Sequence, residues 1–71
     1  MSPREQAASF ARLAKHHGGE AGRYALKASI LLNEGKRDLA ETTLLRAKTE
    51  HALAEHYLAE AERIAACLFE V

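Results

Sequence analysis

Four histidines in a chain of 71 residues are the side chains with the most evident capacity for chemistry. His16 and His17 are adjacent, whereas His51 and His56 lie in the second half of the chain. Imidazole nitrogens bind zinc and other divalent metals, often together with carboxylates. If the two halves of the chain run antiparallel, His16 and His17 come close to His56. These three histidines are therefore candidate metal ligands.

The histidines also have a structural interpretation. Adjacent residues point about 100° apart on a helix, so His16 and His17 converge poorly on one ion. His51 falls within an apolar repeat, where a single polar residue often fixes the register of two helices. We favour this role for His51 over catalysis. No cofactor is predicted, and Cys67, the single cysteine, is interpreted as a small apolar residue.

The helix that would carry two of these histidines repeats by sevens between Asp38 and Val71. Its repeating positions are Ala40, Ala47, Ala54 and Ala61, interleaved with Leu44, His51, Leu58 and Ala65, and closed by Leu68. This spacing is typical of a long helix that packs lengthwise on another helix. Tyr57, Ile64 and Val71 widen the apolar stripe. Because alanine lets two helix axes approach closely, we expect a tight antiparallel neighbour.

Start and stop signals divide the chain. Ser2 can cap a helix that has proline at its first position, and Gly18-Gly19 favours an end or a bend. Gly35 is a second stop signal, and Asp38 with Glu41 has the spacing of a capping box. Three helices are predicted, at about residues 3–17, 20–34 and 38–70.

Residues 3–34 are about as long as residues 38–70, so the sequence predicts an all-α antiparallel hairpin with its first arm broken at Gly18-Gly19. The pattern leaves open whether the glycine pair is a kink or a full turn. The whole chain, 1–71, is expected to form one domain. Either arrangement leaves apolar surface unburied, and two hairpins forming a helical bundle would cover it.

A partner is therefore expected, either a second copy of the chain or another helical protein. The predicted interface lies on the long helix and comprises Leu44, His51, Ala54, Tyr57, Leu58, Ala61, Ile64, Ala65, Leu68 and Val71.

Part of the chain resembles a single tetratricopeptide repeat. The matching positions are Tyr24, Ala28, Leu31, Gly35, Ala40, Leu44 and Ala47. This resemblance implies a tightly packed helical hairpin, since stacked arrays of such repeats need about three copies. The plan of the whole chain resembles the antiparallel hairpins of the ROP type, which implies architecture alone.

Composition limits the function. The chain has ten basic and ten acidic residues and a net charge of zero, which argues against a nucleic-acid partner. No apolar run, Ile30-Leu31-Leu32 included, is long enough to cross a membrane, and none follows the start as in a signal peptide. We expect no membrane partner and a cytoplasmic location.

Non-enzymatic protein–protein interaction is the leading prediction: a small adaptor, chaperone or regulatory subunit that acts through the apolar seam of the long helix. The alternatives are a histidine-based metal-binding bundle and a weak nucleic-acid-binding dimer. The second alternative would use Arg12, Lys15, Arg23, Lys27, Lys36 and Arg37.

Overall fold

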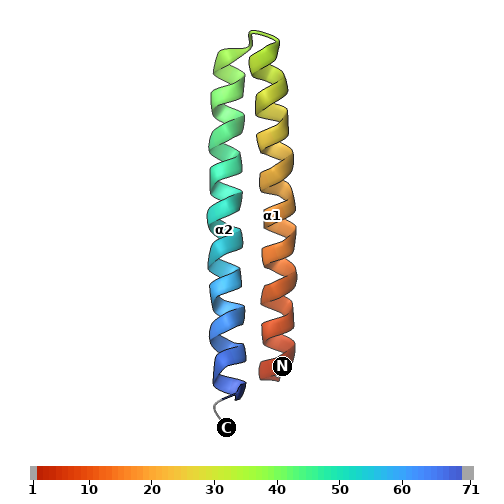
Figure 1. Cartoon of the computed structure of the whole chain (residues 1–71), viewed down its shortest axis with the longest axis vertical. Helices are drawn as coiled ribbons and strands as arrows, with labels where there is room; N and C mark the ends of the chain where they lie inside the picture. Colours follow the sequence, from red (N-terminus) through yellow and green to blue (C-terminus); the bar gives the residue numbers. More distant parts are fainter. Residues whose placement is uncertain (1, 70–71) are drawn as a thin grey trace.

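Two long helices lie side by side and antiparallel along their whole length (Figure 1). The structure, a computed structural model, describes residues 2–69, and no strand occurs in that range. Helix α1 spans Pro3–Asn33 with 31 residues, and helix α2 spans Arg37–Phe69 with 33 residues. The hairpin measures 55 × 14 × 14 Å. The predicted all-α hairpin is confirmed.

The predicted break in the first arm is wrong, because α1 continues through Gly18 and Gly19 without interruption. Within residues 2–69 only Gly35 has a positive φ, so both of these glycines keep helical geometry. A glycine inside a helix costs about 1 kcal/mol relative to alanine. The packing of α1 against α2 before and after the glycine pair can offset that cost. The three predicted helices are therefore two.

Helix α1 begins where the sequence predicts. The Ser2 hydroxyl accepts a hydrogen bond from the Glu5 backbone N–H at 3.2 Å and donates one to the Glu5 carboxylate at 3.1 Å. Pro3 occupies the first turn, where no backbone N–H is required. The Ser2 cap is thus confirmed.

Gly35 closes the turn between the helices. Its φ of 77° is left-handed, and its N–H donates to the Leu32 carbonyl at 3.0 Å. The Lys36 N–H donates to the Leu31 carbonyl at 2.9 Å, which completes a Schellman motif. Helix α2 then begins at Arg37, one residue before the expected start. Asp38 consequently lies in the first helical turn, where its charge favours the helix dipole, and is not the capping residue.

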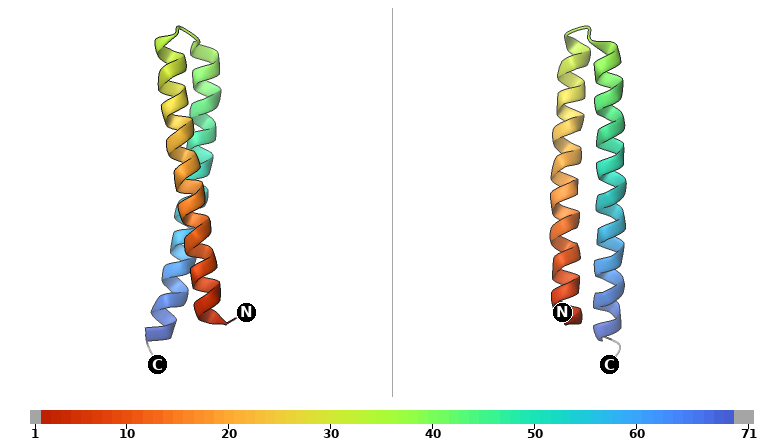
Figure 2. Two further views of the ribbon diagram at one scale, coloured as in Figure 1. Left: turned by 90° about the vertical axis from the view of Figure 1, so that its right-hand side faces the viewer. Right: turned by 180° about the vertical axis from the view of Figure 1, so that it is seen from behind.

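Two alanine ladders form the contact between the helices. The seven-residue repeat of α2 has a counterpart on α1, which consists of Ala7, Ala14, Ala21 and Ala28. Among residues 2–69 the buried apolar residues are Ala28, Ala40, Ala47, Ala61 and Ile64. No large side chain in this range is fully buried. The two helices wind around one another, so that they exchange sides when seen edge-on (Figure 2).

The second half of the α2 seam differs from the prediction. The residues that alternate with the alanines against α1 are Thr43, Glu50, Tyr57 and Ile64, all at least partly buried, whereas Leu44, His51 and Leu58 are exposed and Ala65 is partly exposed. Both sets alternate with the same alanines in steps of three and four residues, so the spacing alone is compatible with either set facing α1. The expected position of His51 within the seam is therefore wrong.

Candidate functional site

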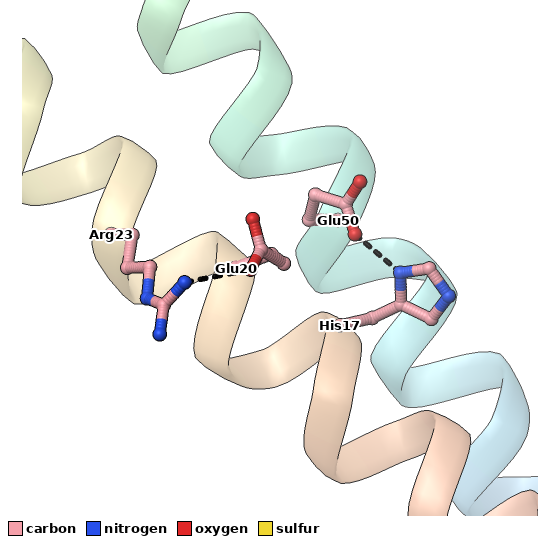
Figure 3. A network of polar contacts seen from close by, with 4 residues as sticks. All are labelled: His17, Glu20, Arg23 and Glu50. Atoms are coloured by element: carbon pink, nitrogen blue, oxygen red, sulfur yellow. Dashed lines mark hydrogen bonds and ion pairs between the residues drawn. The ribbon is translucent and has the colours of Figure 1, made fainter.

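The polar residue pair inside the seam is His17 with Glu50. The Nδ1 atom of His17 is hydrogen-bonded to the Glu50 carboxylate across the two helices (Figure 3). The side chains are 19% and 23% exposed, respectively, so most of each is withdrawn from water. A polar pair in this setting stabilises the hairpin only while both partners are present.

An aromatic stack continues from this pair toward the open end of the hairpin. The Tyr57 ring stacks on His17 at a centroid distance of 5.5 Å and on Phe10 at 5.9 Å. The His56 ring meets the edge of Tyr57 at 5.5 Å, and His16 meets His17 at 5.2 Å. Tyr57 thus contacts one histidine from each half of the chain, His17 and His56.

Metal binding by these histidines stays a prediction. Within residues 2–69 no group of three histidine, cysteine or acidic side chains is placed to hold one metal ion. His16 and His56 are exposed, and His17 is engaged by Glu50. Glu20, the nearest carboxylate on α1, instead accepts a hydrogen bond from Arg23 at 3.2 Å (Figure 3).

The flank of the hairpin that carries the aromatic residues combines polar pairs with the exposed Leu39, which is on the same seven-residue line as Arg46. Arg46 lies 6.0 Å from the centroid of the Tyr24 ring, a cation–π distance. Farther along α2, Arg63 donates a hydrogen bond to Glu60 at 2.8 Å. This hydrogen bond, with the charge of the guanidinium, lowers the pKa of the Glu60 carboxyl below its ordinary value.

The opposite flank is a shallow apolar groove between the helices. Near the turn it has a volume of about 420 Å³ and is lined by Ala25, Ala28, Ser29, Leu32, Arg37, Ala40, Glu41 and Leu44. It continues toward the middle of the hairpin along Gly18, Ala21, Gly22, Ala25, Ala47, Lys48 and His51. Leu58 and Ala65 follow His51 at seven-residue steps and so extend the same side of α2. We call this side the groove face.

Three leucines stand out from the groove face. Leu32 is 59% exposed, Leu44 is 44% exposed and Leu58 is 49% exposed. The floor between them consists largely of alanine and glycine, so these leucines have few neighbours of their own chain to pack against. Aligned, exposed apolar side chains are a common feature of protein–protein interaction surfaces.

The residues predicted as an interface divide between two places. Ala54, Tyr57, Ala61 and Ile64 face α1 of the same chain, whereas Leu44, His51, Leu58 and Ala65 lie on the groove face. Leu68 is 38% exposed near the end of α2, and Val71 lies outside the described residues. Four predicted interface residues are therefore available to a partner on one continuous side.

The basic residues considered for nucleic-acid binding gather only in part. Arg12, Lys15 and Arg23 line one shallow depression on the outer side of α1, together with His16 and Glu20. Lys36 and Arg37 lie at the turn. Glu20 pairs with Arg23 and so offsets part of the positive charge.

Sequence reasoning missed the His17–Glu50 pair and the groove. The signal for both was the seven-residue periodicity of α1, in which Phe10, His17, Tyr24 and Leu31 form one line and Ala11, Gly18, Ala25 and Leu32 form another. The assumed break at Gly18-Gly19 divided both lines. A continuous helix makes the first line face α2 and the second line border the groove.

Comparison of the chain with known protein families, curated protein sequences and solved structures gives no significant match in any of the three. Neither described helix is both long and apolar enough to cross a membrane.

Proposed function

We propose that this protein is a non-enzymatic interaction module that binds a helical partner along its groove face. The observation that carries the proposal is the row of exposed leucines Leu32, Leu44 and Leu58 over a floor of alanine and glycine. An amphipathic helix recognises such a groove through apolar residues spaced three and four apart. A cytoplasmic adaptor, chaperone or regulatory subunit would use the surface in this way.

The composition of the groove face supports the proposal. Its central side chains are small or apolar apart from His51, and the charged residues Arg37, Glu41 and Lys48 stand at its border. Protein–protein interfaces have this arrangement, an apolar centre surrounded by a polar rim.

The test uses Leu44→Glu as the disruptive variant and Leu45→Glu as its control. Leu45 is 63% exposed but is not among the residues that line the groove, so both variants add one charge to an exposed leucine of α2. Each variant, with a photo-crosslinker at Ala25, is compared with the same labelled wild-type chain in native cell extract. We expect specific cross-linked products, including any with a second copy, to be lost with Leu44→Glu and retained with Leu45→Glu. Products that are unaffected by both changes, or absent throughout, would contradict the proposal.

A further inference from the structure

The surface area of the hairpin is too large for a chain of its mass. The accessible surface is 5453 Å². A compact globular monomer of this mass exposes roughly 4,400 Å². The excess, roughly 1,000 Å² per chain, exceeds the approximately 800 Å² that each partner contributes to a stable protein–protein interface. A second copy of this chain on the groove face could remove that excess.

We infer that the partner of the groove face is a second copy of this chain, packed face to face with its turn at the opposite end. This inference rests on the proposed function, because it identifies the helical partner of the same surface. The assembly is a four-helix bundle in which every helix is antiparallel to its neighbours. The core of that bundle contains Leu32, Leu44 and Leu58 of both copies, and it also encloses His51, which lies between Leu44 and Leu58 on the same face.

The distribution of large and small residues along the groove determines the orientation. The half near the turn carries the protruding Leu32 and Leu44. The half near the chain ends carries Ala11 and Ala65 at the corresponding heptad positions, and Leu58 lies just beyond the middle of α2. With the turns at opposite ends, Leu44 of one copy faces Ala65 of the other, and Leu58 faces His51. With the turns at the same end, leucine meets leucine and alanine meets alanine, which leaves a void that close packing disfavours.

Charge at the rim is compatible with the same orientation. In an antiparallel pair of helices, residues at the same level have residue numbers that add up to nearly the same value. When Leu44 of one copy lies level with Ala65 of the other, Lys48 therefore lies level with Glu62 of the second copy. Lys48 and Glu62 are both exposed along the outer border of the groove face. Opposite charges then meet at this rim, which favours one register over a shifted one.

The first experiment measures the mass of the protein in solution by sedimentation equilibrium over a range of micromolar concentrations. We expect two copies for the wild type and for Leu45→Glu, and one copy for Leu44→Glu. Far-UV circular dichroism checks that Leu44→Glu stays helical. If Leu44→Glu unfolds, Leu58→Glu takes its place, because Leu58 lies on the same face and is 49% exposed.

The second experiment measures the distance between spin labels on the single cysteine. Cys67 is exposed. It follows Arg46 by a whole number of seven-residue steps and so lies on the same side of α2 as Arg46, which is the aromatic flank and faces away from the groove. At 1.5 Å per residue Cys67 lies about 20 Å from the middle of α2, so turns at opposite ends separate the labels by about 40 Å or more. Turns at the same end bring them within about 25 Å, given helix layers packed about 10 Å apart.

The outcomes separate this inference from the proposed function. A wild type that stays monomeric at all concentrations overturns the second copy as partner, whereas the cross-linking test of the groove face is unaffected. A dimer that persists in folded Leu44→Glu overturns both. A dimer with a label distance near 25 Å overturns the opposed orientation. A dimer lost only with Leu44→Glu, with labels 40 Å apart or more, supports the inference.

Discussion

At the scale of single residues, His17 and Glu50 are the pair on which the register of the hairpin depends. Every other position in the seam holds an apolar, small or aromatic residue or a threonine that bonds its own helix, as Thr43 does with the Leu39 carbonyl at 2.8 Å. If the helices slide by one turn, His17 and Glu50 each lose their partner while still shielded from water. That loss makes a shifted register unfavourable, much as a buried polar pair specifies register in coiled coils.

Replacing His17 alone should therefore destabilise the hairpin. His17→Leu leaves the Glu50 carboxylate without its partner, and we expect the free energy of unfolding to fall by about 1–3 kcal/mol. The double variant His17→Leu with Glu50→Leu should recover wild-type stability or exceed it, because two apolar residues replace the pair. Urea unfolding at one fixed protein concentration measures both changes.

Arg63→Gln is the control for that experiment. It breaks the exposed hydrogen bond between Arg63 and Glu60, which lies outside the seam, and should alter stability little. A His17→Leu variant as stable as the wild type would show that the pair with Glu50 does not hold the register.

At the scale of the helices, the sequence predicts the element type and the alanine contact but not the continuity of α1. Composition and caps define where the chain is helical, and Ser2 and Gly35 act as expected. Gly18-Gly19 misleads, because intrinsic propensity is local whereas the packing of α1 against α2 extends over the whole helix. Whether the line of Leu44 or the line of Tyr57 faces α1 is likewise not determined locally, because it depends on which bulky residues of α1 lie opposite.

Because α1 is continuous, replacement by alanine is expected to have opposite effects on stability at Gly19 and at Gly35. A Cβ atom at Gly19 would meet nothing within 4 Å, and this residue has helical φ, so Gly19→Ala should stabilise the protein by about 1 kcal/mol. Gly35 has a φ of 77°, so Gly35→Ala should destabilise it by about 1 kcal/mol. Thermal unfolding at matched concentration compares the two variants. If Gly19→Ala lowered the melting temperature, α1 would have to be broken at that point in solution.

At the scale of the whole molecule, the hairpin is a rod rather than a globule. Its radius of gyration is 16.0 Å, whereas a compact domain of this length has a radius of about 11 Å. A rod of two helices has a single line of contact, which explains why no large side chain within residues 2–69 is fully buried. A further layer of helices supplies the second side of a core, and the groove face has apolar residues to contribute to it.

Small-angle X-ray scattering can separate the ways in which two rods associate. Face-to-face packing adds a layer about 10 Å away without adding length, so the radius of gyration should rise only to about 17 Å while the forward scattering per chain doubles. End-to-end association would double the length and raise the radius far above that value. Leu44→Glu should return both quantities to those of a single hairpin, whereas Leu45→Glu should leave them unchanged. Doubled forward scattering with a strongly increased radius would place the contact at the ends of the rod and contradict the groove face as the surface of association.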